Sequence, residues 1–372
     1  MRKFAVVSGL VLVGSLFGAV SSQAVEFAVV GARAAGMGGA GVAVTTDAFA
    51  TYWNPAGLAM TKTVDIRIGA TGQLVDRLGA RDTLDDLKNF NASDPSAASK
   101  AQDIANRLNK PAASLSGIAA GGLYVKGYYG EHALGFNVSD VATAGMFVSQ
   151  RVTATGTTIT GQMALNGLEA RQAVVSYAYA FMDRTFSIGV SGKVIQGAAY
   201  TGSAAIQGGS DISFSDNLGK AKTSTAFGID VGAMYRPSSW LRVGIVAKDI
   251  NKPSFDNSAG GQFKLDPQVR GGVAINPWET LTLTADMDIT ANRTLNPDIK
   301  SQVLSVGAEQ TVFSELFSLR VGAFKNTADA NSYITPTAGF GLRLWALRAD
   351  IGGGYDFRER GALASFNLGL VF

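Results

Sequence analysis

The chain ends in the stretch RGALASFNLGLVF, residues 360–372, in which two kinds of side chain alternate. Successive side chains of a β-strand point to opposite faces. One face of this stretch is therefore apolar, and the other is mostly small or polar. The apolar face consists of Ala362, Ala364, Phe366, Leu368, Leu370 and Phe372. The pattern predicts a terminal β-strand with a continuous apolar face.

Similar segments recur along the chain from residues 64–75 to this last stretch, about fourteen in all. The connections between them alternate between long and short, and the three longest are 76–113, 140–167 and 197–223. Membrane β-barrels have an even number of strands, short periplasmic turns and longer extracellular loops. The sequence therefore predicts an all-β fold, a transmembrane antiparallel barrel of about 14 strands over residues 63–372. Both of its ends would face the periplasm.

Charged side chains occupy the second face of the predicted strands. Asp286 and Asp288, for example, alternate with Leu283, Ala285 and Met287. A charge on the lipid face of a barrel costs roughly 2–4 kcal/mol near the midplane, so the polar face is expected to line the lumen. The predicted lumenal charges are Arg67, Lys193, Asp230, Arg242, Lys248, Asp286, Asp288, Glu309, Arg320, Lys325, Arg343, Arg348 and Asp350.

The N-terminus has the order of a secretory signal peptide. Arg2 and Lys3 precede an apolar run over residues 4–20, and Ser22 and Ala24 supply small side chains for a cleavage site. Residues 1–24 are therefore predicted to be a leader. The alternative, an uncleaved membrane anchor, is disfavoured because the run is marginal for spanning about 30 Å of hydrocarbon. Removal of the leader lowers the formal charge from +3 to about +1, which gives no reason to expect a nucleic-acid partner.

Residues 25–62 lack the two-residue period and are rich in Gly and Ala. Gly36, Gly38 and Gly41 form a G-x-G-x-x-G pattern. A dinucleotide site would require a βαβ unit around that pattern, whereas predicted barrel strands follow it here. We interpret these glycines as positions where two backbones pack closely together.

The long connection 76–113 carries helical signals. Asp94 and Pro95 are suited to begin a helix, and Ile104, Ala105 and Leu108 follow with helical spacing. Two interpretations remain open for this connection, a lid that captures an apolar ligand and a cover for the barrel rim.

Two stretches carry a resemblance to a known family. The run 31–44 and the later residues Asp47, Tyr52-Trp53 and Asn54-Pro55-Ala56-Gly57 resemble the N-terminal hatch of the FadL superfamily. The stretch 228–255 is similar to the conjugal-transfer TraF-like branch, whose general build the PorV-type secretion components share. The terminal Phe372 is also typical of outer-membrane barrels.

The resemblance implies a hatch over residues 25–62 that closes a barrel of fourteen strands. It also implies a passive transporter for small hydrophobic compounds, such as long-chain fatty acids, with a lateral exit at a kink in the strand 130–139. The residues that would form the ligand site and gate are Phe49, Trp53, Asn54, Pro55, Ala56 and Gly135. Two alternatives stay open. One is a non-transporting barrel that docks a secretion, conjugation or surface-attachment partner, and the other is a channel for polar solutes.

Catalytic chemistry finds little support in the sequence. The chain has no Cys, and its one His is His132, so neither a nucleophile–base pair nor a His/Cys metal cluster is indicated. We therefore expect a protein that is not an enzyme and that binds no cofactor or metal. The expected location is the bacterial outer membrane. The expected partners of a monomer are the lipid bilayer, lipopolysaccharide, hydrophobic small molecules and the barrel-assembly machinery, which would recognise Phe372.

Overall fold

A computed structural model describes residues 27–210, 212 and 220–372 of the chain. The predicted leader, residues 1–24, lies outside the described residues. No helix in these described ranges is long and apolar enough to cross a membrane.

The barrel consists of fourteen antiparallel strands, and it closes where the first strand pairs with the last. Asp65 is paired with Val371 at one end of that seam, and Leu74 with Ala362 at the other. The predicted fold and strand number are confirmed. The strands are β1 (Asp65–Asp76), β2 (Ser114–Tyr129), β3 (His132–Thr155), β4 (Thr158–Phe181), β5 (Phe186–Gln207), β6 (Lys222–Ser238), β7 (Leu241–Lys248), β10 (Gln268–Trp278), β11 (Leu281–Asp288), β14 (Val303–Val312), β15 (Phe317–Asn326), β16 (Thr335–Leu344), β17 (Leu347–Asp356) and β18 (Gly361–Val371).

The outer face of the barrel is apolar. In β18 the side chains of Ala362, Ala364, Phe366 and Leu370 are exposed, and the intervening residues from Leu363 to Gly369 are buried. Exposed apolar side chains also project from the other barrel strands, Ile68, Val175, Phe227, Ile245, Val321 and Ile351 among them. Trp240, Trp278 and Trp345 are exposed beside the short turns. An apolar belt edged by aromatic side chains is the surface that a transmembrane barrel presents to lipid.

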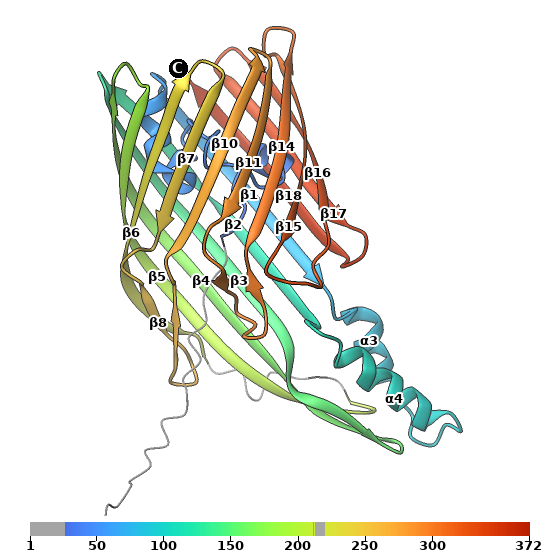
Figure 1. Ribbon diagram of the computed structural model, residues 1–372. Helices are drawn as coiled ribbons and strands as arrows, with labels where there is room; N and C mark the ends of the chain where they lie inside the picture. Colours follow the sequence, from blue (N-terminus) through green and yellow to red (C-terminus); the bar gives the residue numbers. More distant parts are fainter. Residues whose placement is uncertain (1–26, 211, 213–219) are drawn as a thin grey trace, which may run out of the picture.

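The prediction of loops is wrong for most of residues 140–167 and for residues 197–207. Strands β3 and β4 instead continue to a two-residue turn at Gly156 and Thr157, where Gly156 has a positive φ of 59°. Strand β5 likewise continues to Gln207, and β6 starts at Lys222. Figure 1 shows these extensions leaving the barrel at the end opposite the C-terminus.

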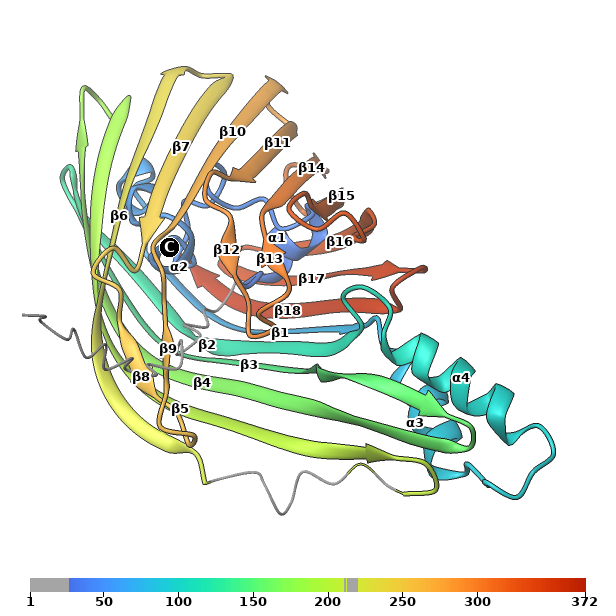
Figure 2. The ribbon, with the colours of Figure 1, turned by 60° about the horizontal axis from the view of Figure 1, so that its bottom comes forward.

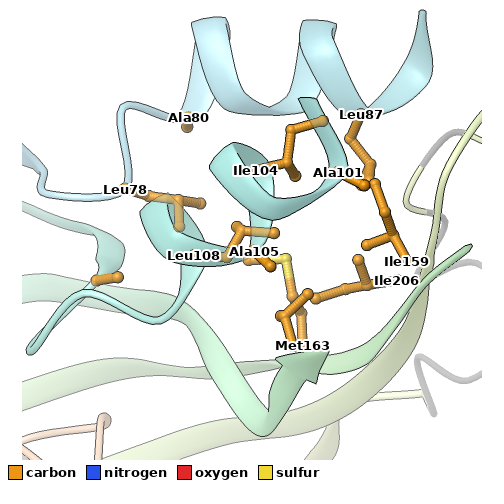
Figure 3. Close-up of a cluster of buried hydrophobic side chains, with 12 residues drawn as sticks. Leu78, Ala80, Leu87, Ala101, Ile104, Ala105, Leu108, Ile159, Met163 and Ile206 are labelled. Carbon is orange, nitrogen blue, oxygen red and sulfur yellow. The ribbon is translucent and has the colours of Figure 1, made fainter. Parts of the chain in front are cut away.

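The extended strands are stabilised by two helices from the connection 77–113. These are α3 (Ala80–Lys88) and α4 (Ala97–Leu108), so the predicted helical content is confirmed, although the N-cap residue of α4 is Ser96 rather than Asp94. One face of each helix packs against the strand extensions (Figure 3). The buried cluster includes Leu87, Ile104, Leu108, Val152, Ile159, Met163 and Ile206. The extensions persist as strands because the helices cover their apolar face.

Two small hairpins fold over the mouth of the barrel near these extensions. One pairs β8 (Ser254–Asp256) with β9 (Gln262–Lys264), and the other pairs β12 (Asn292–Arg293) with β13 (Lys300–Ser301). Figure 2 shows β12 and β13 across the ring of strands.

The N-terminal segment, residues 27–64, lies inside the barrel at the end near the C-terminus (Figures 1 and 2). It contains α1 (Ala32–Gly36), α2 (Ala50–Trp53) and the 3₁₀ helix η1 (Pro55–Met60). Most of its side chains are buried against the lumenal faces of the strands.

Candidate functional site

A ring of polar contacts holds α1 of the N-terminal segment against the barrel wall. Arg33 donates to Glu309 with an Nη2–Oε1 distance of 2.6 Å, and Arg320 donates to the same carboxylate at 2.6 Å. Arg320 also bonds Asp350 at 2.8 Å. The ring then returns to α1, because Asn367 donates to Asp350 at 2.8 Å and accepts from the backbone N–H of Ala32 at 2.9 Å.

Asp286 and Arg67 bind later parts of the N-terminal segment to the barrel wall. The Asp286 Oδ2 accepts from the backbone N–H groups of Gly41 and Val42, each at 2.7 Å. Arg67 bonds Asp65 at 2.8 Å and approaches Asp47 of the segment at 3.2 Å. Asp286 and Arg67, like Glu309, are therefore predicted lumenal charges that bind the segment.

The other predicted charges except Lys325 also lie on the lumenal side. Asp230 binds Lys193 at 2.7 Å, and Asp288 binds Arg270 at 2.6 Å. The partly exposed charges are Arg242, whose Nη1 is 3.3 Å from the Ala43 oxygen, Arg343, which pairs with Glu315, and Arg348.

Lys325 pairs with Leu304, which is 40% exposed on the outer face, whereas its neighbours Phe324 and Asn326 line a lumenal cavity. Lys325 therefore points outward, and its prediction as a lumenal charge is wrong.

Asn54 joins the N-terminal segment to itself and to the wall. Its Oδ1 accepts from the Ala56 N–H at 3.1 Å and thereby caps η1, where Pro55 occupies the first position. Its Nδ2 donates to the Val42 and Ala233 oxygens, each at 3.2 Å. Asn54, Pro55 and Ala56 are fully or almost fully buried.

Phe49 and Trp53 are buried in the same segment. The ring of Phe49 lies 4.6 Å from that of Tyr124 on β2. Trp53 stacks on Phe27 at 5.3 Å and donates its indole N–H to the Val30 oxygen at 2.8 Å. Both rings pack the segment against itself and the wall.

Gly135 lies where the N-terminal segment contacts β3. A methyl group at this position would be 2.4 Å from Thr51 Cγ2 and 3.0 Å from Leu58 Cδ1. Its pairing with Lys126 on β2 and with Ser176 on β4 belongs to an unbroken register on both sides. The absence of a side chain at Gly135 thus makes room for the segment, and β3 has no bulge there.

An inner cavity of about 60 Å³ adjoins the N-terminal segment. Its walls combine apolar side chains, Leu168, Ile195 and Leu265 among them, with Tyr52 and the lysines Lys193 and Lys248. Lys193 is held between Asp230 and Asp249, and its distance to Asp249 Oδ1 is 2.6 Å. The Lys248 ammonium lies 3.5 Å from the centre of the Tyr52 ring and 4.3 Å from that of Phe27.

The charges around the inner cavity are balanced. Two lysines, Lys193 and Lys248, lie among two carboxylates, Asp230 and Asp249. Among the described residues Lys248 forms no ion pair of its own, and its ammonium is stabilised by the two aromatic faces. The cavity can therefore accept an apolar molecule with a small polar group.

A cluster of buried apolar side chains separates the inner cavity from a second cavity nearer the mouth. Its residues are Leu168, Ile195, Ala199, Phe255, Phe263, Leu265 and Leu295. Leu168, Ile195 and Leu265 also line the inner cavity, whereas Leu295 lines the second one. The apolar cluster thus lies between the two cavities.

The outer cavity has a volume of about 130 Å³ and lies among β1, β2, β12, β13 and the ends of β17 and β18. Its apolar wall includes Leu295, Val303, Phe324 and Leu363. Its charged wall consists of Arg77, Asp356 and Glu359.

The surroundings of Glu359 in this wall change its pKa. Burial raises the pKa of Glu359 above its ordinary value, and the negative charges of Asp356 and Asp329 act in the same direction, whereas Arg77 lowers it. Arg77 bonds Glu359 at 3.1 Å and also pairs closely with Asp329.

Metal-binding groups do not assemble within the described ranges. No three His, Cys, Asp or Glu side chains in them are placed to hold a metal ion. His132 is exposed at the start of β3, where its Nδ1 lies 2.8 Å from the Tyr177 hydroxyl.

Several residues of the interior escaped sequence reasoning. Phe255 and Phe263 lie in a short hairpin that has no strand-length period, and Asp356 and Glu359 lie at a turn between two strands. Their shared location in the lumen depends on strand pairing across the barrel. The alternation of the apolar Phe263 and Leu265 with Gln262 and Lys264 was the available signal for the apolar cluster.

The comparisons with solved structures show the fold. The CymD monoaromatic hydrocarbon channel is 13% identical, with a TM-score of 0.59 over 94% of this chain and 98% of that one. A FadL homologue from Pseudomonas aeruginosa is 12% identical, with a TM-score of 0.56 over 95% and 99% of the two chains. The toluene transporter TbuX of Ralstonia pickettii is 12% identical, with a TM-score of 0.53 over 92% and 97%.

These likenesses confirm the resemblance to FadL-type barrels at the level of fold. No curated protein matches the chain. A family model described as "F plasmid transfer operon, TraF, protein" matches residues 51–288, which is more than half of the sequence. The chain therefore belongs to this TraF family and has a FadL-type barrel fold.

Proposed function

We propose that the protein is a passive outer-membrane transporter for small hydrophobic compounds and that the N-terminal segment is its hatch. The observation that carries the proposal is the sequence of spaces inside the barrel: an outer cavity, an apolar cluster and an inner cavity that ends at the segment. An apolar molecule loses contact with water along this path and gains apolar contacts. The apolar belt and the solved channels of the same fold support the location and the class of cargo.

Transport requires the N-terminal segment to move. The inner cavity ends at buried residues of the segment, and the register of β2, β3 and β4 is continuous beside Gly135. In our proposal the segment shifts while the barrel stays closed. A lateral exit at Gly135 would first require Thr51 and Leu58 to leave it.

The proposal also includes the finer expectation of long-chain fatty-acid-like cargo. The Lys248 ammonium would meet the carboxylate of such a ligand beside the apolar wall of the inner cavity. Parallel uptake assays with a long-chain fatty acid and a monoaromatic hydrocarbon separate this finer expectation from the general one.

The absence of Cys from the chain allows a direct test with a reversible cross-link. In the double variant Thr51→Cys/Gly135→Cys, a disulfide is expected to form, because a Cβ at position 135 would lie 2.4 Å from the present Thr51 Cγ2. We expect oxidation to stop uptake of labelled hydrophobic compounds by cells that carry the protein in their outer membrane. Reduction should restore it.

The wild-type chain under the same oxidant is the matched control, since it has no thiol. Uptake that continues at full rate through the cross-linked protein would overturn gating by the segment. Uptake that equals that of cells without the protein, in both redox states, would overturn transport itself.

The second candidate function is docking of a conjugation or secretion partner, and the family match favours it. The helix-covered strand extensions offer a surface beyond the barrel for such a role. Loss of DNA transfer or secretion on deletion of the gene, with uptake unchanged, would favour this candidate.

A further inference from the structure

Two carboxylate oxygens in the wall of the outer cavity accept no hydrogen bond from the described residues. Asp356 is 3% exposed and Glu359 is 9% exposed. Asp356 Oδ1 accepts the Arg358 and Glu359 N–H groups, and Glu359 Oε2 accepts from Arg77. In the part of the chain that the structure describes, Asp356 Oδ2 and Glu359 Oε1 have no hydrogen-bond partner. A buried charged acceptor left without a donor is costly, so a donor brought by a ligand would bind favourably.

The cations near this wall do not balance its negative charge. Arg77 lies between Asp329 and Glu359, so one guanidinium faces two carboxylates before Asp356 is counted. Arg358 is exposed, and its guanidinium lies over the Tyr333 ring at 4.6 Å. The charged side chains that line the cavity are Arg77, Asp356 and Glu359 alone. The wall therefore has an excess of negative charge.

The remaining walls favour an organic cation over a metal ion. The described ranges contain no group of three acidic or His/Cys side chains suited to a metal. The apolar side chains of Leu295, Val303, Phe324 and Leu363 face the same space. A ligand that suits both the acidic and the apolar part of the wall combines a positively charged hydrogen-bond donor with a hydrocarbon body.

We infer that the outer cavity binds amphipathic amines, with the ammonium group at Asp356 and Glu359 and the hydrocarbon part against the apolar wall. The inference rests on the proposed transport function and competes with the fatty-acid-like cargo named there, because the outer cavity would disfavour a carboxylate. Of two compounds with equal hydrocarbon parts, the amine should enter in preference to the carboxylate. The outer cavity thus acts as a charge filter ahead of the apolar cluster.

The test uses the full-length protein in lipid nanodiscs and three probes of one chain length: hexylamine, hexanol and hexanoate. Isothermal titration at neutral pH should show hexylamine binding about tenfold more tightly than hexanol, with hexanoate weakest, as expected for one partly screened charge pair. Asp356→Asn and Glu359→Gln should each reduce that preference. Both changes keep a side-chain oxygen that can accept the present hydrogen bonds.

Asp298→Asn is the matched control. Asp298 is an exposed carboxylate on the turn beside Asn296 and Ile299, which line the cavity, but it does not line the cavity itself. This variant should keep the full preference for hexylamine. The shift in electrophoretic mobility on heating shows whether each variant has a folded barrel. The two acidic residues are substituted separately, so that if one variant fails to fold, the other still tests the site.

The outcomes separate this inference from the proposed function. Equal affinity for the three probes, or a preference that both substitutions leave unchanged, would overturn the amine site while leaving transport of hydrophobic compounds in place. No binding or uptake of any probe, hexanol included, would overturn both. Tight binding of Ca²⁺ that depends on Asp356 and excludes hexylamine would assign the cavity to a metal instead.

Discussion

At the scale of single residues, glycines shape the interior of this barrel, because they have no side chain. Gly135 on β3 leaves space for Thr51 and Leu58, and Gly189 on β5 leaves space for the backbone at Pro55. A methyl group at Gly189 would be 2.4 Å from the Pro55 carbonyl carbon. The N-terminal segment can therefore approach the wall closely at these positions.

Gly135→Ala should loosen the N-terminal segment without unfolding the barrel. The added methyl overlaps Thr51 and Leu58, and such overpacking typically costs about 1–3 kcal/mol. Limited trypsin digestion of the purified protein should release fragments cut at Arg33 or Lys62 faster than in the wild type. Gly127→Ala on β2 is the control, because no atom lies within 4 Å of its added methyl. Equal digestion rates for the two variants would contradict the packing role of Gly135.

The lumenal charges show how far sequence reasoning reaches at this scale. Apart from Lys325, which points outward, their sidedness was predictable, because a charge among apolar neighbours at a two-residue period has to avoid lipid. Their individual partners were not. Glu309 meets Arg33 across 276 residues of sequence, and a strand pattern contains no information on which backbone will enter the lumen. The prediction that the gate residues contact ligand stays a prediction.

At the scale of elements, the helices α3 and α4 explain the strand extensions that the sequence did not predict. Residues 150–162 contain Thr, Gln and Gly in place of a strong apolar alternation. The few apolar positions, Val152 and Ile159 among them, become a strand face only when the helices cover them. Strand propensity depends on packing context more than on local sequence, which is why this part was predicted to be a loop.

Leu108→Ala should loosen the two helices and leave the barrel unchanged. Leu108 is 1% exposed in the cluster with Ile104 and Met163, and truncation of a buried Leu typically costs about 2–5 kcal/mol. Protease digestion of intact cells should cut the connection 77–113 sooner, while the heat-dependent mobility of the barrel stays as in the wild type. Lys100→Ala removes a surface ion pair with Asp94 and should change neither readout. An unfolded barrel in Leu108→Ala would show that the helices support the whole structure.

The hairpin of β8 and β9 is the second element with a testable role. Phe255 is fully buried in the apolar cluster between the two cavities. Phe255→Ala should join the cavities and raise the initial rate of uptake of a small hydrocarbon, although the lost packing destabilises the hairpin by about 3–5 kcal/mol. Phe227→Ala changes the same residue type on the outer face of β6 and should leave uptake unchanged. A lower rate in Phe255→Ala would mean that the ring binds cargo rather than separating the cavities.

At the scale of the whole molecule, the barrel and the N-terminal segment form one connected polar network under an apolar exterior. Glu309 is central to it, because it binds Arg33 of the segment and Arg320 of the wall. Fold class, strand number and sidedness followed from sequence period, which is a property of each strand by itself. The cavities did not, because they arise where several strands and hairpins meet.

Glu309→Gln should weaken closure of the barrel by the segment. The change leaves two guanidinium groups without their shared carboxylate, and breaking a buried ion pair typically costs about 3–5 kcal/mol. Planar bilayer recordings should show open events more often than for the wild type. Glu315→Gln, which alters a partly exposed pair with Arg343, is expected to behave as the wild type does. Identical silent recordings from both variants would show that other contacts suffice to hold the segment.

The ring of contacts through α1 has a consequence for the order in which the protein is assembled. The ring begins at Arg33 and Ala32, near the first described residues, and it includes Asn367 in the last strand, 335 positions away from Ala32. A chain that is made from its N-terminus cannot complete this ring until its final residues have been synthesised and inserted. The segment can therefore be fully bound only late in biogenesis, once β18 has paired with β1.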